Sequence, residues 1–319
     1  MDFKNIDFVF AKLPKIFVSQ GCFSKLVDKI QQLDPGVIII VTGKNSYKNT
    51  NHFDILNKTC KDYGFSSYHV ICEYEPDPAL VDNVCKDLKG SKVSLCIGLG
   101  GGSALDAAKA ISAMLCESEP VKNYLEGVGD LKPSGKRVHL VMLPTTSGTG
   151  SEVTKNAVIS SIGGDGFKKS LRHDGYIADE VYIEGTARSY TEVNRSLIKS
   201  KMNQIIEGVS NTYGAKINFE YVDGYPPTIN SSNCAKKVLK AAKKVVGDKA
   251  GLPYLSMGGE DFSYYLQKRP GCFFFVGSAP DPTKLFGTPQ HCSHYDIDEK
   301  SLSIGPSVFL NLVDDILGN

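Results

Sequence analysis

The sequence predicts an α/β fold: an open parallel, Rossmann-like sheet domain followed by an α+β fragment. Short apolar runs at residues 37–41, 93–97 and 138–143 are typical of buried strands, and segments of helical character lie between them. Strands that alternate with helices indicate a parallel sheet whose ligands bind at the carboxyl ends of the strands. We assign the α+β fragment to the residues after 184.

The remaining elements follow from local signals. Pro78 is expected to begin a helix that runs to Leu88, because proline is tolerated in the first turn. The other expected helices span residues 50–63, 191–213, 232–246 and 308–317, and the other expected strands span 68–72, 216–222 and 272–276. The five lysines of the helix at 232–246 are interpreted as a solvated face.

Composition excludes several classes of function. The 319 residues carry a net charge of +1 with no long block of one sign, which argues against nucleic acid or an anionic membrane as the main partner. No apolar run reaches the roughly 20 residues of a membrane helix, and the first residues lack a signal-peptide core. The nine cysteines form no C-x-x-C pair. A soluble, cytoplasmic protein is therefore expected.

The most informative stretch is VSLCIGLGGGSALDAAKAISAM, residues 93–114. Glycines separate the strand from an alanine-rich helix that is expected to begin at Ser103, and Ser103 with Asp106 matches a capping box. Converging backbone N–H groups and the helix dipole favour an anion, and glycine lets a pyrophosphate approach closely. The stretch therefore predicts phosphate binding, with a tight turn that binds nothing as the alternative.

A second loop, PTTSGTGSEVT at residues 144–154, follows the strand at 138–143. Its hydroxyl and N–H groups suit a ribose and phosphates, but loops of serine, threonine and glycine are also ordinary linkers. From composition alone the ligand role of this loop stays open.

The segments GLGGGSALDAAKAIS, PTTSGTGSEVT and KKSLRHD, in this order and spacing, resemble the iron-containing alcohol dehydrogenase family from about Phe8 to Glu184. The resemblance implies that residues 1–184 form a dehydroquinate-synthase-like domain that binds NAD(P). It also implies that the pyrophosphate lies on the glycine loop and that Lys168 meets a ribose. The expected cofactor-binding residues are Gly43, Gly100, Gly101, Gly102, Ser103, Asp106, Thr145, Thr146, Thr149, Ser151 and Lys168.

One departure from the family concerns the choice of cofactor. Where NAD-dependent members carry an acidic residue after the first strand, this sequence has Gly43 followed by Lys44. A carboxylate there would hydrogen-bond the ribose 2′-hydroxyl and repel a 2′-phosphate. Its replacement favours NADP over NAD, although Gly43 also suits an ordinary turn at the end of a strand.

The family's iron is held by one aspartate and three histidines of a second, all-helical domain, which the residues after Ile183 do not resemble. Without that Lewis acid, alcohol or aldehyde turnover is expected to be weak or absent. No catalytic residue is assigned.

Residues 185–319 resemble zinc amidohydrolases of the aminoacylase, hippurate hydrolase and IAA-amino acid hydrolase type. The segments that carry the likeness are GTARSY, YPPTIN, SMGGEDFSYY, FFFVG and HCSHYDIDE. The resemblance implies a remnant of the lid or dimerisation domain at 185–230 and the C-terminal part of the catalytic domain at 231–319. It also makes His291 a metal ligand. The chain is therefore chimeric, and its ligand sets for iron or zinc are incomplete.

Three functions remain open from the sequence. The favoured one is an NAD(P)-binding member of the alcohol dehydrogenase family whose partner is a small-molecule cofactor. The second is a metal-dependent amidohydrolase acting on N-acyl amino acids, with metal held partly by His291. The third is a non-catalytic module in which residues 185–222 form a homodimer by adding a strand to a second chain.

Overall fold

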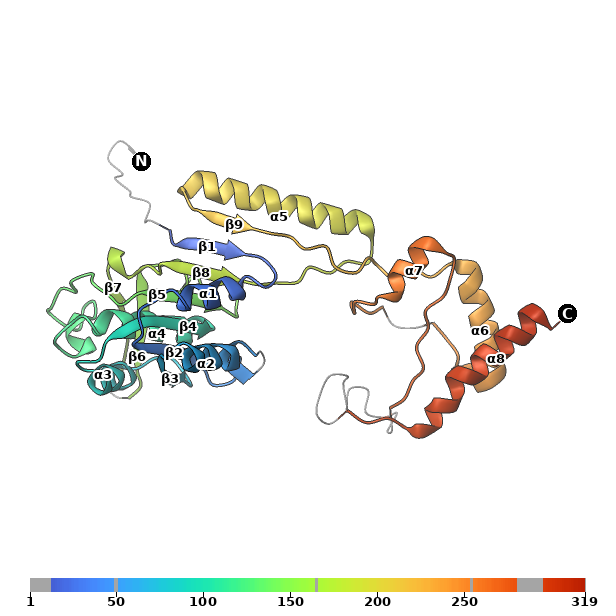
Figure 1. Cartoon of the computed structure of the whole chain (residues 1–319), viewed down its shortest axis with the longest axis horizontal. Coiled ribbons are helices and arrows are strands. Elements are labelled where there is room, and N and C mark those ends of the chain that lie inside the picture. The colour runs from blue at the N-terminus through green and yellow to red at the C-terminus, as the bar shows by residue number, and fades with distance from the viewer. Residues whose placement is uncertain (1–12, 49–50, 164–165, 253–254, 280–294, 319) are drawn as a thin grey trace. The chain divides into compact units, whose positions relative to one another are not determined.

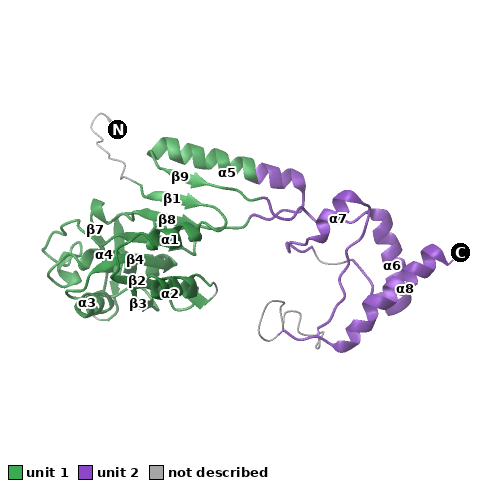
Figure 2. Cartoon of the chain, in the orientation of Figure 1, with its two compact units in different colours: residues 1–186, 199–222 green, residues 187–198, 223–319 purple. Residues whose placement is uncertain are grey.

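The computed structural model describes residues 13–48, 51–163, 166–252, 255–279 and 295–318. The chain divides into two compact units: unit 1 comprises Met1–Thr186 and Lys199–Val222, and unit 2 comprises Ala187–Ile198 and Asp223–Asn319 (Figure 2). The domain boundaries that the sequence places after residues 184 and 230 stay predictions.

Unit 1 is built on a seven-stranded sheet in the order β3-β2-β4-β5-β8-β1-β9 (Figure 1). Every neighbouring pair is parallel, so the open parallel sheet predicted from the sequence is confirmed. A separate antiparallel hairpin joins β6, Asn156–Ser161, to β7, Phe167–Arg172. The sheet strands are β1 (Lys15–Val18), β2 (Val37–Gly43), β3 (Ser66–Cys72), β4 (Val93–Gly100), β5 (Leu140–Pro144), β8 (Glu180–Ile183) and β9 (Ile217–Phe219).

Helices cover both faces of this sheet. The sequence of strand β2 is a continuous apolar run because both of its faces are buried. Ile38 and Ile40 pack in one hydrophobic cluster, and Ile39 and Val41 pack in the other. The first cluster includes residues of α1 and α2, and the second includes residues of α3 and α4. These helices are α1 (Phe23–Ile30), α2 (His52–Asp62), α3 (Pro78–Asp87) and α4 (Gly102–Met114).

Helix α4 lies unusually close to the sheet at Gly98 of β4. A Cβ atom at this position would lie 2.9 Å from Met142 Sδ and 3.0 Å from Ala108 Cβ. Both distances are shorter than a normal van der Waals contact, so any larger residue would push α4 off the strand. Gly98 therefore fixes how the beginning of α4 meets the carboxyl edge of the sheet.

After β8 the chain forms α5, Glu192–Tyr213, which ends at Gly214 with a φ of +64°. The expected strand at 216–222 is present but shorter, and as β9 it pairs with β1. No residue of this helix is buried, and the side chain of Ile205 is 64% exposed. Within the described residues, the apolar side of α5 is therefore left without a covering layer.

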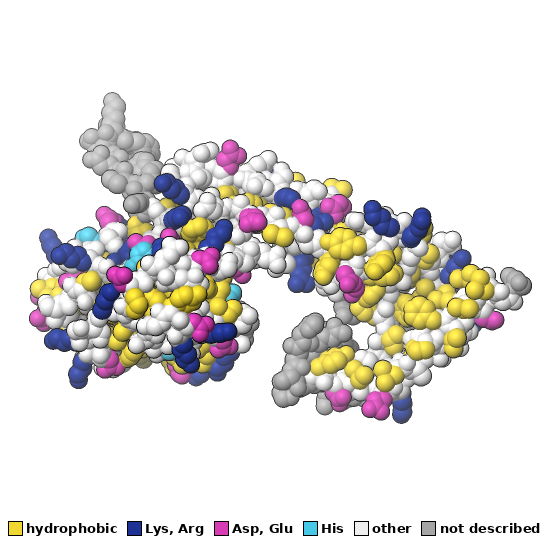
Figure 3. Space-filling model, in the orientation of Figure 1, with side chains coloured by type: hydrophobic (Ala, Val, Ile, Leu, Met, Phe, Trp, Pro, Cys, Tyr) yellow, Lys and Arg dark blue, Asp and Glu magenta, His cyan; other side chains and the backbone are white. Residues whose placement is uncertain are grey.

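Unit 2 contains helices α6 (Ser232–Val246), α7 (Phe262–Lys268) and α8 (Ile304–Leu317). Its lysines at 236, 237, 240, 243 and 244 are exposed, as predicted for a solvated face. Many apolar side chains are exposed as well, including Phe309, Leu310 and Val313 of α8 (Figure 3). Within the described residues, no helix is both long and apolar enough to cross a bilayer.

The strand expected at 272–276 is not formed. The backbone N–H of Phe273 donates to Asn230 Oδ1 and its carbonyl accepts from Asn230 Nδ2, both at 2.8 Å. The side-chain amide thus takes both hydrogen bonds that a neighbouring strand would supply. An apolar sequence alone does not distinguish a strand that pairs with another strand from an extended segment whose backbone bonds a side chain.

The contact at Gly98 leads to a direct prediction. Gly98→Val should lower the free energy of unfolding by about 2 kcal/mol, because the new side chain overpacks the interface between α4 and the sheet. Urea unfolding followed by circular dichroism measures this loss. Gly208→Ala in α5 is the control, because a Cβ there meets nothing within 4 Å and alanine favours a helix. Equal stability of the two variants would contradict the packing role of Gly98.

Candidate functional site

A pocket of about 290 Å³ lies at the carboxyl edge of the sheet, at the ends of the neighbouring strands β3, β2, β4 and β5. We call it the glycine-loop pocket. It is lined by Gly43, Lys44, Cys72, Glu73, Tyr74, Gly101, Gly102, Ser103, Ala104, Thr145 and Thr146. Six of these residues belong to the set expected to bind a cofactor: Gly43, Gly101, Gly102, Ser103, Thr145 and Thr146. Their binding role stays a prediction.

The beginning of α4 faces this pocket. Gly101 is the N-cap residue in an extended conformation, and no side chain caps the helix there. The predicted capping box is therefore wrong: the helix begins at Gly102, one residue earlier than expected, and Asp106 turns into the protein. An uncapped helix N-terminus presents backbone N–H groups and a partial positive charge to the pocket. This arrangement suits an anionic ligand.

Asp106 serves the interior of unit 1. Its carboxylate accepts a hydrogen bond from the backbone N–H of Val158 at 3.2 Å and is itself 8% exposed. Burial raises the pKa of Asp106, while the nearby charge of Lys109 and the hydrogen bonds of Val158 and Ser151 act against that rise. Asp106 thus joins α4 to strand β6 behind the pocket and is absent from the pocket lining.

The loop at 144–154 lies against the glycines of α4. The Thr145 N–H donates to the Gly100 carbonyl at 2.9 Å, which fixes the start of the loop at the end of β4. A Cβ on Gly101 would lie 3.3 Å from Thr146 Oγ1, and one on Gly102 would lie 3.2 Å from Thr149 Cβ. Because these glycines have no side chain, they leave room for the loop as well as for a ligand. Sequence reasoning had assigned them to the ligand alone.

Lys109 anchors the far end of this loop, and sequence reasoning missed it. The side chain is fully buried, and Nζ donates to the carbonyls of Ser151, Thr154 and Asn156, each at 2.7 Å. Burial lowers the pKa of Lys109 to about 8, and the charges of Asp106 and Glu152 oppose that effect. A lysine between the buried alanines of LDAAKAIS was the available signal.

Lys168, expected to meet a ribose, lies on β7 outside the pocket lining. Its Nζ pairs with Glu75 Oε1, and the other oxygen of Glu75 accepts the hydroxyl of Ser160. These hydrogen bonds lower the pKa of Glu75. A contact between Lys168 and a ribose would therefore compete with this ion pair. Gly100, Thr149 and Ser151, also expected to bind the cofactor, are likewise absent from the pocket lining.

Two charged residues line the other end of the pocket. Lys44 was expected only to favour NADP by its charge, and Glu73 was not expected at all. Gly43 and Cys72 are partners in the register of β2 and β3, so Lys44 and Glu73 follow at adjacent strand ends. Lys44 Nζ lies 3.2 Å from Glu73 Oε2 and 5.9 Å from the centre of the Tyr74 ring. The motif EYEP directly after a predicted strand was the signal for Glu73.

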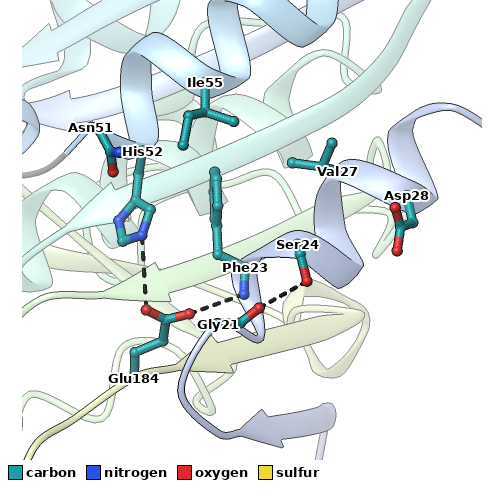
Figure 4. Close-up of a pocket in the computed structure, with 9 residues that line it drawn as sticks. All are labelled: Gly21, Phe23, Ser24, Val27, Asp28, Asn51, His52, Ile55 and Glu184. Atoms are coloured by element: carbon teal, nitrogen blue, oxygen red, sulfur yellow. Dashed lines mark hydrogen bonds and ion pairs between the residues drawn. The ribbon is translucent and has the colours of Figure 1, made fainter.

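A further pocket, of about 370 Å³, lies between the beginnings of α1 and α2 (Figure 4). Glu184 Oε1 accepts the backbone N–H of Phe23 at 3.1 Å, and Glu184 Oε2 lies 3.9 Å from His52 Nε2. The side chains of Val27 and Ile55 contribute apolar wall. Because Glu184 is engaged in capping α1, we assign the functional site to the glycine-loop pocket.

The described residues do not fit a catalytic metal ion. Within them, no three His, Cys, Asp or Glu side chains come together in a group that could hold one. His291, the metal ligand implied by the amidohydrolase resemblance, lies outside the described residues. We therefore derive no chemical step through iron or zinc.

Comparison with known proteins finds two different sets of relatives. The sequence model of the family described as iron-containing alcohol dehydrogenase matches residues 14–184. A putative amidohydrolase, YhaA, from Bacillus subtilis is 35% identical over 130 residues, which are 40% of this chain and 32% of that protein. An uncharacterized hydrolase, SH1513, from Staphylococcus haemolyticus is 36% identical over 151 residues, which are 43% of this chain and 38% of that protein. The chain thus spans about a third of the length of these curated relatives.

Solved structures that match part of this chain include a dehydrogenase and a reductase. NADH-dependent butanol dehydrogenase A from Thermotoga maritima has a TM-score of 0.49 and 24% identity, and the match covers 56% of this chain and 44% of that one. Sulfoacetaldehyde reductase from Bifidobacterium kashiwanohense, solved with NAD⁺, has a TM-score of 0.47 and 21% identity, with coverage of 56% and 46%.

The anchoring by Lys109 can be tested by substitution. Lys109→Met should lower the free energy of unfolding by about 3 kcal/mol, because one buried and two partly buried carbonyls lose their donor. Hydrogen exchange at residues 151–156 should accelerate in the same variant, since the loop is no longer held to α4. Lys89→Met, at an exposed position, is the control and should change stability by less than about 0.5 kcal/mol. Unchanged exchange in Lys109→Met would contradict the anchor.

Proposed function

This chain belongs to the iron-containing alcohol dehydrogenase family, whose sequence model covers residues 14–184, and we propose that its unit 1 binds a nicotinamide adenine dinucleotide in the glycine-loop pocket. The observation that carries this proposal is the uncapped N-terminus of α4 at the carboxyl edge of the sheet. There the diphosphate rests on the backbone N–H groups of Gly101, Gly102 and Ser103.

The rest of the pocket fits the other parts of such a cofactor. Hydroxyl groups of Thr145 and Thr146 line the pocket beside the glycines and can hydrogen-bond a phosphate or a ribose. Gly43 and Lys44 line its opposite end. Because Gly43 offers no carboxylate to repel a 2′-phosphate and Lys44 offers a positive charge, the site favours NADP(H) over NAD(H).

Cofactor binding is the activity that we propose, with weak or no turnover of alcohols or aldehydes. An iron ion held as in the family would supply a Lewis acid for the alcohol oxygen. The described residues form no group that fits such a metal, so they support the cofactor half of that chemistry. Hydrolysis of N-acyl amino acids, the alternative raised by the amidohydrolase resemblance, would depend on His291 and on partners outside the described residues.

Titration of NADPH with the purified protein tests the proposal. NADPH fluorescence should change in a saturable manner, and Gly101→Val should weaken binding about ten-fold or more, because its side chain enters the space of the diphosphate. The far-ultraviolet circular dichroism of the variant should match the wild type, since the extended backbone at Gly101 accepts any residue and the close neighbour of the new Cβ, Thr146 Oγ1 at 3.3 Å, belongs to a side chain that can move. Absence of any fluorescence change at millimolar protein and cofactor would refute the function.

A second candidate function, homodimerisation, is favoured by one observation. Strand β9 lies at the edge of the sheet, and the neighbouring helix α5 exposes Ile205. An open strand edge next to an apolar helix surface is a template for pairing with a second chain.

Light scattering tests the dimer. Ile205→Asp should shift the measured mass towards the monomer, because dimerisation would bury the new charge. Asn203→Asp introduces the same charge at a polar position of α5 and should leave the mass unchanged. A wild-type mass equal to that of one chain would rule the dimer out.

A further inference from the structure

The glycine-loop pocket contains an ion pair that the cofactor must meet. Lys44 Nζ and Glu73 Oε2 are 3.2 Å apart, and about half of each side chain is exposed, 53% and 50% respectively. Both residues line the pocket. Because exposed ion pairs are weak, a strongly charged ligand group can compete for either partner.

The position of this pair along the sheet edge determines which part of the cofactor it faces. Strands β3, β2 and β4 are neighbours, about 4.8 Å apart in a sheet. A diphosphate on the N–H groups after β4 places its adjoining ribose over the ends of β2 or β5. The ends of β2 and β3 carry Lys44 and Glu73, whereas the end of β5 carries the hydroxyls of Thr145 and Thr146. The charged end of the pocket therefore suits the ribose whose 2′ substituent distinguishes NADP from NAD.

We propose that Glu73 and Lys44 together set the choice between NAD(H) and NADP(H), with Glu73 supplying from β3 the carboxylate that Gly43 leaves out of β2. This inference rests on the cofactor binding proposed above. With NAD(H), the 2′-hydroxyl donates a hydrogen bond to the Glu73 carboxylate, and Lys44 keeps its ion pair. With NADP(H), the 2′-phosphate takes Lys44 from Glu73 and is repelled by the carboxylate that remains.

The consequence is a site that accepts both cofactors. Lys44 favours the 2′-phosphate and Glu73 opposes it, so the preference for NADP(H) is small in the wild type. Tyr74 helps to keep the lysine in place, because its ring lies 5.9 Å from Lys44 Nζ on the same pocket rim. When either Lys44 or Glu73 is made neutral, the charge that remains determines the preference between the two cofactors.

Dissociation constants for NADPH and NADH, measured by fluorescence for the wild type, Lys44→Met and Glu73→Gln, test this inference. The quantity of interest is the preference for NADPH, defined as the dissociation constant for NADH divided by that for NADPH. We expect a wild-type preference below about ten. Lys44→Met should lower it about ten-fold, and Glu73→Gln should raise it about three-fold or more. The effect of Lys44→Met should shrink at 1 M salt, since screening weakens the contact with the 2′-phosphate.

Lys86→Met, an exposed lysine of α3 away from the pocket, is the matched control and should leave the preference at its wild-type value. If the wild type binds cofactor but both pocket variants keep the wild-type preference, the role of the ion pair is refuted while cofactor binding stands. A Glu73→Gln variant that shifts towards NADH would also overturn it. If neither cofactor binds the wild type, both the inference and the proposed function fail.

Discussion

The close contact between α4 and the sheet at Gly98 is the constraint on which the rest of unit 1 depends. It holds the beginning of the helix at the carboxyl edge of the sheet. There Gly101 is the N-cap residue, and no side chain caps the helix. Helix N-termini are usually satisfied by a Ser, Thr, Asp or Asn side chain. Here the stabilisation that a cap would provide is given up, and the N–H groups of Gly102 and Ser103 stay available at the pocket.

Charged groups on two sides of this helix start have separate tasks. Behind it, Asp106 and Lys109 are buried and join α4 to the strand and loop that follow, so they hold the geometry of the pocket. In front of it, Lys44 and Glu73 are half exposed and paired only with modest strength. The buried groups therefore set the shape of the site, and the exposed pair remains free to respond to a ligand.

The sequence was sufficient for the parallel sheet, because strands buried on both faces are continuous apolar runs such as residues 37–41. It also brought together the glycine loop and Thr145, since carboxyl ends of parallel strands share one edge. It failed where tertiary contacts override local patterns. Ser103 and Asp106 match a capping box, but Asp106 bonds Val158 instead. Residues 272–276 resemble a strand, but Asn230 occupies the backbone groups of Phe273.

The most direct measurement of the central claim is a set of amide chemical shifts recorded by NMR while inorganic pyrophosphate, and then NADPH, is added. The account predicts that Gly101, Gly102 and Ser103 shift most with both ligands, and that Lys44 and Glu73 respond to NADPH alone. Shifts confined to other parts of the chain at saturating ligand would contradict it, because the diphosphate would then not be held by the start of α4.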